Sequence, residues 1–86
     1  MYVLLQFYRT AIVYRMSMKI GSHVAWKWAN GLAEGIIAEI HTERVEIVSK
    51  GKRIVRNGTP DDPALVIDHA SGNQVLKLMY EVQITD

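Results

Sequence analysis

Three aromatic residues beyond position 18 are the side chains best suited to bind a ligand. Trp26 and Trp28 are two positions apart, and Tyr80 lies near the C-terminus. The faces of such rings attract cations, for example a methylated lysine or arginine, by about 0.5 to 2 kcal/mol each. Trp26 is expected to fill the core, whereas for Trp28 a core position and a surface position are both open. The two remaining rings are few for a cation cage, but Trp28 and Tyr80 are the candidate ligand-binding residues.

A second candidate site is a basic cluster formed by Lys50, Lys52, Arg53 and Arg56, within which no acidic residue falls. These cations could contact nucleic-acid phosphates, with Trp28 as a platform on which bases stack. A second interpretation is that charges on an exposed hairpin keep an edge strand from pairing with other chains. The formal net charge of +1 gives no general attraction to nucleic acid and favours the second interpretation.

No combination of residues predicts catalysis, a metal site or a cofactor. The chain lacks cysteine, which excludes a thiolate zinc site, a cysteine nucleophile and a disulfide. Asp61 and Asp62 lie between two prolines, where carboxylates typically accept hydrogen bonds from nearby backbone N–H groups of a turn. The serines and threonines have no nucleophile-elbow context, and no glycine-rich phosphate loop opens a helix. Three histidines are spread singly and are expected on the surface or in turns: His23, His41 and His69.

The size and composition indicate one small globular domain. A chain of 86 residues buries only about 60% of its unfolded surface, so its core must be regular. Hydrophobic residues make up 49% of the chain and charged residues 22%, as in ordinary folded domains. A secreted domain of this size would typically carry disulfides, so the absence of cysteine favours a reducing, cytoplasmic location.

From Lys19 onward, short apolar runs alternate with Gly, Pro, Asn and Asp, a pattern typical of a small all-β fold. Two strand-like runs flank Lys50 and Gly51 and predict a β-hairpin. Ile37 and Ile40 are three positions apart, and a β-bulge between them would bring both side chains inward. Five or six short strands closed into an SH3/Tudor-like barrel would remove exposed edges. The expected strands are 23–28, 35–40, 44–49, 52–57, 64–68 and 74–78, followed by a helical turn and a short closing strand within 79–85.

The segment 1–18 differs from the rest and is treated as an N-terminal extension to a barrel at 19–86. It contains four of the five Tyr and Phe residues, and its only charges are two arginines. One of them, Arg9, interrupts an apolar run that is shorter than the roughly 20 residues needed to span a bilayer. Three interpretations remain open: an additional strand or helix packed on the barrel, an interfacial anchor, or an overlong gene start upstream of a natural start at Met16 or Met18.

Several stretches together resemble a known family. The opening 19–26 (Lys-Ile-Gly-Ser-His-Val-Ala-Trp) resembles the start of many SH3-like barrels. More particular are 33–43, the loop Arg-Asn-Gly-Thr-Pro-Asp-Asp-Pro-Ala at 56–64, and Ser-Gly-Asn-Gln-Val-Leu-Lys at 71–77. In that order they are similar to the hypervirulence-associated proteins with a Tudor domain. The resemblance covers about 19–82 and implies a Tudor-like, SH3-type barrel without an established ligand.

These observations predict a non-catalytic binding or interaction module. A protein or peptide is the expected ligand, held at a surface that carries Trp28, Tyr80 and the neighbouring loops. Nucleic-acid binding through the basic hairpin 50–56 is one alternative, and homo-oligomerisation through an exposed edge or the apolar N-terminus is another. No cofactor, metal ion or membrane partner is expected.

Overall fold

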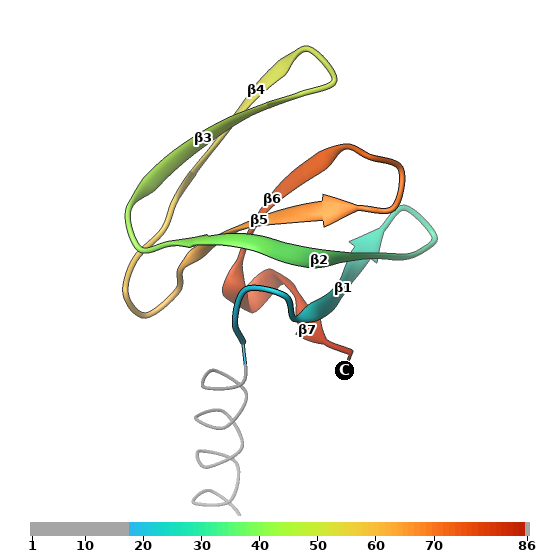
Figure 1. Cartoon of the computed structure of the whole chain (residues 1–86), viewed down its shortest axis with the longest axis horizontal. Helices are drawn as coiled ribbons and strands as arrows, with labels where there is room; N and C mark the ends of the chain where they lie inside the picture. The colour runs from blue at the N-terminus through green and yellow to red at the C-terminus, as the bar shows by residue number, and fades with distance from the viewer. Residues whose placement is uncertain (1–17, 86) are drawn as a thin grey trace, which may run out of the picture.

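The computed structural model describes residues 18–85, which are nearly all β (Figure 1). A five-stranded antiparallel sheet has the strand order β6-β5-β2-β1-β7, and β3 and β4 form a separate two-stranded sheet. One 3-10 turn, η1 (Met79–Glu81), joins β6 to β7. The all-β prediction is confirmed, with β7 as the short closing strand. The strands are β1 (His23–Trp28), β2 (Gly31–His41), β3 (Arg44–Ser49), β4 (Lys52–Asn57), β5 (Ala64–His69), β6 (Gln74–Leu78) and β7 (Gln83–Ile84).

Segment 1–18 lies almost entirely outside the described residues. Its three interpretations, an additional packed element, an interfacial anchor and an upstream gene start, therefore stay predictions. Met18 is its one described residue, and it is buried against the core. Within residues 18–85, no helix has the length and apolar character that a membrane crossing requires.

Strand β2 connects the two halves of the five-stranded sheet. Residues 31–36 pair with β1, and residues 35–41 pair with β5 on the other side. The register to β5 shifts between Ile37 and Glu39, which places the predicted β-bulge there. Ile37 is buried and Ile40 packs against the same core cluster. The prediction that both isoleucines face inward is therefore confirmed, and the bulge bends the strand as a curled sheet requires.

The turn between β1 and β2 is tighter than the sequence-based strand boundaries implied. Ala29, with φ 51°, and Asn30 form the turn, and β2 begins at Gly31 rather than at Gly35. A two-residue turn with positive φ matches the twist of paired strands, so pairing resumes at once. As a result, Leu32 belongs to β2 and lies opposite Lys27 of β1.

The inner face of the five-stranded sheet holds the main core. Leu65 and Ile67 of β5 are fully buried there, and Trp26 of β1 is only 4% exposed. The prediction that Trp26 fills the core is confirmed. Burying each such side chain stabilises the fold by about 1.5 to 3 kcal/mol, so this cluster holds the curled sheet together.

The opposite face of β5 carries a second, smaller core cluster. Successive residues of a strand point to opposite faces, and Ala64 and Val66 of β5 are buried together with Leu76 of β6. Half-buried side chains of the β3–β4 hairpin cover them: Val45, Ile47 and Ile54. The hairpin therefore forms a second layer outside the five-stranded sheet, as the ribbon shows (Figure 1), and does not extend that sheet.

The β3–β4 hairpin is fixed by backbone geometry at both of its ends. Lys50 and Gly51 have φ angles of 54° and 76°, as a two-residue hairpin turn requires, and the predicted hairpin is confirmed. At the base, the Gly58 N–H donates a hydrogen bond to the Glu43 carbonyl at 3.1 Å. Gly58 leaves no room for a side chain, because a Cβ there would lie 2.7 Å from the backbone nitrogen of Ala64.

Candidate binding site

An open groove lies beside β1 in the five-stranded sheet. Its volume is about 490 Å³, and it is lined by residues 25–27 of β1, Leu32 of β2 and residues 81–83 around the start of β7. The lining includes two apolar residues, Leu32, which is 67% exposed, and Val82, which is 5% exposed and packs in the main core, and two charged residues, Lys27 and Glu81. The groove can therefore bury an apolar side chain of a ligand and also pair with a charge.

The groove exists because β1 extends farther than its neighbour β7. Strand β7 is two residues long and pairs only with Val24 and Ala25. The chain before it forms η1, so no described strand continues alongside Trp26, Lys27 and Trp28 on that side. The space that a longer β7 would occupy is the groove.

Trp28 and Tyr80, the two candidate ligand-binding residues, are not among the residues that line the groove. Each is the next residue in sequence beyond the groove lining, Trp28 at the end of β1 and Tyr80 in η1. Trp28 is 68% exposed and Tyr80 is 74% exposed. The sequence left both a core and a surface position open for Trp28, and the structure places it at the surface. The two rings do not contact each other. Within residues 18–85, the one ring contact is between Trp26 and His69, whose centroids are 6.2 Å apart.

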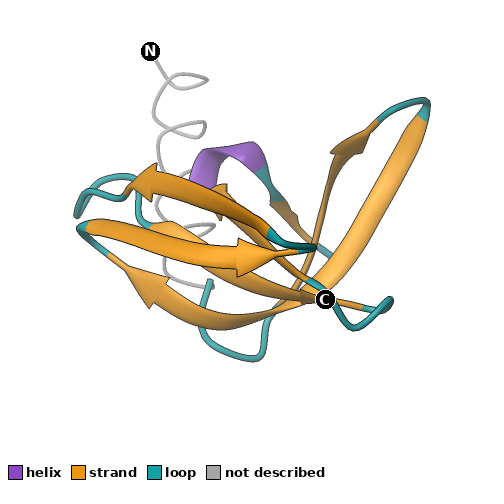
Figure 2. Ribbon diagram, turned by 90° about the horizontal axis from the view of Figure 1, so that it is seen from above, coloured by secondary structure: helices purple, strands orange, loops and turns teal. Residues whose placement is uncertain are grey.

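The loop before β5 sets the position of Tyr80. The Tyr80 N–H donates a hydrogen bond to an Asp62 carboxylate oxygen at 3.1 Å, and the Met79 N–H donates one to the Pro63 carbonyl at 2.8 Å. The sequence predicted that Asp61 and Asp62 bond nearby backbone N–H groups. Asp62 does accept a backbone N–H, but one 18 positions away, because the loop packs against η1. Viewed from above, η1 lies to one side of the strands (Figure 2).

Most of the described residues match a known protein family. The family model described as hypervirulence associated proteins TUDOR domain matches residues 21–82. This chain belongs to that family. The match confirms the resemblance noted in the sequence, and it indicates a small binding module of a generally non-catalytic kind whose ligand is not defined. No curated protein and no solved structure matches the chain.

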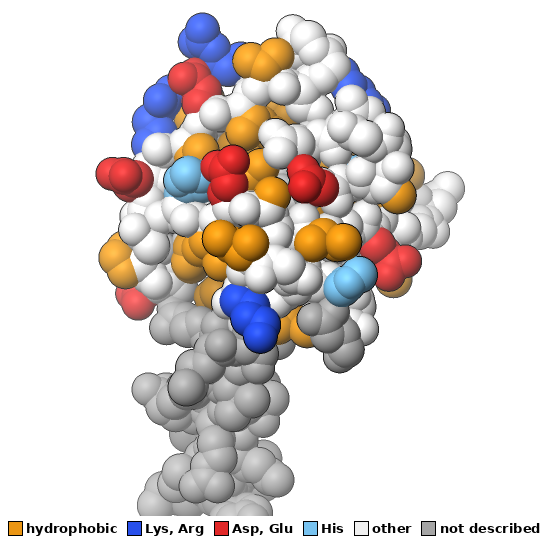
Figure 3. Space-filling model, in the orientation of Figure 1, with side chains coloured by type: hydrophobic (Ala, Val, Ile, Leu, Met, Phe, Trp, Pro, Cys, Tyr) orange, Lys and Arg blue, Asp and Glu red, His pale blue; other side chains and the backbone are white. Residues whose placement is uncertain are grey.

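The four cations of the basic hairpin do not share one face of this Tudor domain. Side chains alternate along a strand, so Arg53 points to the opposite face from Lys52 and Arg56, while Lys50 lies in the turn. In the space-filling view, several Lys and Arg side chains lie near the top, over the β3–β4 hairpin, with acidic side chains close by (Figure 3). Within residues 18–85, Lys50 and Lys52 have no ion-pair partner.

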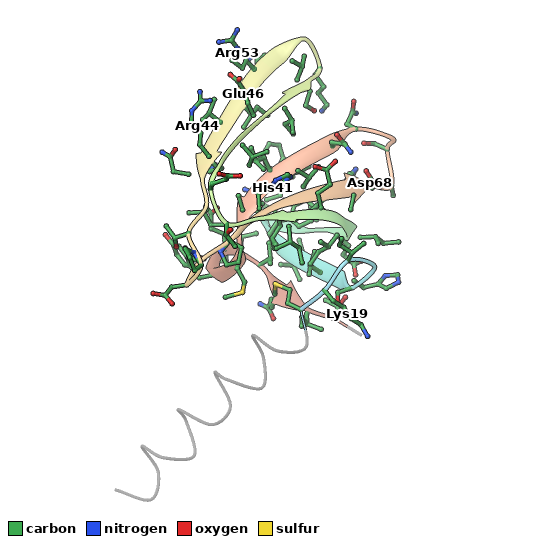
Figure 4. All side chains as sticks on the ribbon, turned by 60° about the vertical axis from the view of Figure 1, so that its left-hand side comes forward. Lys19, His41, Arg44, Glu46, Arg53 and Asp68 are labelled. Atoms are coloured by element: carbon green, nitrogen blue, oxygen red, sulfur yellow. The ribbon has the colours of Figure 1, made fainter. Side chains whose placement is uncertain are left out.

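Carboxylates contact both arginines of the predicted basic cluster. Glu46 Oε1 lies 3.2 Å from Arg53 Nε and 3.6 Å from Arg44 Nη2, and the three side chains lie along the hairpin in Figure 4. Arg56 Nε lies 3.8 Å from Glu81 Oε1. Because Glu81 also lines the groove, the Arg56–Glu81 ion pair links the hairpin layer to the groove wall.

The histidines of the Tudor domain make local contacts at the surface. His41 Nε2 lies 2.7 Å from Glu39 Oε1, and His69 Nδ1 lies 2.8 Å from Ser71 Oγ. The Ser71 N–H also donates to His69 Nδ1 at 3.0 Å, so this serine closes the turn between β5 and β6. Within residues 18–85, no three His, Asp or Glu side chains are placed to hold a metal ion together.

Sequence reasoning missed the groove itself and its residues Lys27 and Leu32. Two local signals could have indicated it. The two-residue turn of Ala29 and Asn30 places Leu32 opposite Lys27, and the helical turn expected after β6 leaves few residues for a closing strand. Together these signals predict a β1 that extends beyond its closing neighbour.

Proposed function

We propose that this Tudor domain binds a protein or peptide segment in the groove beside β1, with Trp28 and Tyr80 as its main contacts. The observation that carries the proposal is an open groove with apolar and charged lining residues, whose sequence neighbours Trp28 and Tyr80 are both exposed aromatic residues. Tryptophan and tyrosine are enriched at the energetic centres of protein interfaces. Their rings bury large apolar areas when a partner covers them.

The separation of the two rings favours an extended ligand over a single enclosed cation. A cation cage needs several ring faces around one cavity, whereas Trp28 and Tyr80 make no ring contact with each other. A peptide can contact both walls and place an apolar side chain against the exposed Leu32. A groove volume of about 490 Å³ is within the range of ordinary ligand sites.

Selection from a displayed library of random dodecapeptides on the immobilised full chain tests this proposal. Selected peptides should lose at least about tenfold in affinity for the Trp28→Ala variant. Val48→Ala is the matched control, because Val48 is 72% exposed but lies on β3 and does not line the groove. Equal losses in both variants, or no loss in Trp28→Ala, would contradict the proposal.

Nucleic-acid binding through the basic hairpin is the alternative proposal, and it depends on Lys50, Lys52, Arg53 and Arg56. Phosphates would have to compete with the carboxylates that already contact the two arginines. Such binding should weaken steeply with salt, and the double variant Arg53→Ala, Arg56→Ala should abolish it. Homo-oligomerisation, the other alternative, would appear in light scattering as a mass well above 9.8 kDa.

A further inference from the structure

The end of β1 presents backbone hydrogen-bonding groups to the groove. The Ile37 N–H donates a hydrogen bond to the Ser22 carbonyl at 3.0 Å. The backbone groups of Ser22, and of every second residue after it along β1, therefore bond toward β2. The Thr85 N–H donates a hydrogen bond to the His23 carbonyl at 2.9 Å. The backbone groups of His23, and of every second residue after it along β1, therefore bond toward the β7 side. Lys27 belongs to this second set, but β7 pairs only as far as Ala25. The N–H and C=O of Lys27 therefore point into the space that β7 leaves open.

Lys27 also supplies the uncompensated charge of the groove. Within residues 18–85, its backbone has no partner on the open side and its ammonium group has no carboxylate partner. Glu81, the acidic residue of the lining, already accepts the Leu78 N–H at 2.7 Å and lies 3.8 Å from the Arg56 guanidinium. The groove therefore presents a free cation beside a free backbone edge.

We infer that the ligand is an extended peptide with an acidic residue, and that it adds as a short strand beside the end of β1. Its backbone exchanges hydrogen bonds with the N–H and C=O of Lys27, as in other cases of strand addition to a sheet edge. Its acidic side chain pairs with the Lys27 ammonium, and an apolar side chain contacts Leu32, which is exposed. This inference rests on the proposed peptide-binding function and specifies how the same groove selects its ligand.

A second copy of β1 fits this edge poorly. Suppose that two copies paired their β1 edges about a twofold axis, through the free backbone groups of Lys27. Lys27 of one copy would then lie directly opposite Lys27 of the other copy. Like charges directly opposite each other destabilise a strand pair. An acidic peptide removes this repulsion, which is why we assign the edge to a different chain.

Backbone substitution in the peptide tests the inference. Acidic dodecapeptides should dominate a displayed-library selection on the full chain. One selected peptide is then synthesised with all amide bonds, and again with each amide in turn replaced by an ester, which removes one N–H donor. The ester at the position facing the Lys27 carbonyl should weaken binding about three- to tenfold, the value of one lost hydrogen bond. In the complex, the Lys27 amide should also exchange its hydrogen more slowly than in the free chain.

Charge reversal supplies the matched variants. Lys27→Glu should abolish the preference for acidic peptides, whereas Lys52→Glu makes the same charge change on β4 and should leave it intact. Peptides that need Trp28, but tolerate every ester and leave Lys27 exchange unchanged, would overturn strand addition and leave the proposed function standing. A selection that yields no peptide dependent on Trp28 or Tyr80 would overturn both.

Discussion

The five-stranded sheet and the β3–β4 hairpin differ in how completely they bury their apolar side chains. In the sheet, Leu65 and Ile67 of β5 are 0% exposed, whereas Val45, Ile47 and Ile54 of the hairpin are only partly buried. The sheet curls around its core, while the hairpin covers β5 and β6 with one face. We infer that the sheet supplies most of the stability and that the hairpin is a more weakly held layer.

The same comparison separates the two candidate sites. The groove is built from β1, β2 and the segment around β7, all joined by hydrogen bonds to the five-stranded sheet. The basic cluster lies on the hairpin, where its cations are divided between two faces. A site on the well-packed sheet keeps its walls in place before a ligand arrives, which lowers the entropic cost of binding.

The largest expected difference is between core substitutions in the two regions. Leu65→Ala should lower the free energy of unfolding by about 2 to 5 kcal/mol, because it empties a fully buried site. Ile54→Ala, at a half-buried hairpin site, should cost about 1 to 2 kcal/mol. Urea denaturation of the full chain measures both. Equal losses would show that the hairpin is as integral to the fold as the sheet.

Gly58, where the hairpin joins the sheet, should tolerate no side chain. Gly58→Ala should lower the free energy of unfolding by about 1 to 3 kcal/mol, since its Cβ would crowd Ala64 and the backbone must shift. Gly31→Ala is the control, because a Cβ there meets nothing within 4 Å, and its effect should stay within about 0.5 kcal/mol. Indistinguishable denaturation midpoints for the two variants would refute the close packing at the hairpin base.

The hydrogen bond from Tyr80 to Asp62 should hold one wall of the groove in place. Asp62→Ala should cost about 0.5 to 1.5 kcal/mol of unfolding free energy and speed hydrogen exchange at the Tyr80 amide. Asp62→Asn keeps an acceptor oxygen at this position and should retain most of the protection. Unchanged exchange in Asp62→Ala would mean that the carboxylate does not position η1.

The smallest effect is expected on the outer face of the hairpin. Glu46 pairs with Arg53 and Arg44, whose side chains are 73% and 58% exposed, and such surface ion pairs contribute little in water. Glu46→Ala should therefore change the free energy of unfolding by less than about 0.5 kcal/mol in urea denaturation. A loss near that of Leu65→Ala would contradict the view of the hairpin as a weakly held layer.

Local patterns in the sequence predicted the turns and strands well. Lys50 and Gly51 between two strand-like runs predicted the hairpin, and the spacing of Ile37 and Ile40 predicted the bulge, because both depend on neighbouring residues. Trp26 was expected in the core, and it is only 4% exposed. The family resemblance predicted the barrel type, which the family match confirms.

Long-range packing could not be predicted from the sequence. The alternation of Val45 and Ile47 shows that one hairpin face is apolar, but it does not show that this face covers β5 from outside the sheet. The contact between Asp62 and Tyr80, which fixes the turn before β7, also joins residues 18 positions apart. Residues so far apart in sequence leave no local pattern that predicts their contact.

An NMR titration of the isotope-labelled full chain with a selected dodecapeptide tests the central claim most directly. The account predicts the largest amide shifts at Lys27, Trp28 and residues 80–83, where the peptide lies against both groove walls. The hairpin amides 50–56 should move little, and physiological salt should weaken the shifts only moderately. Shifts confined to 50–56, or a groove that shows no shift at saturating peptide, would contradict the claim that this Tudor domain binds peptides beside β1.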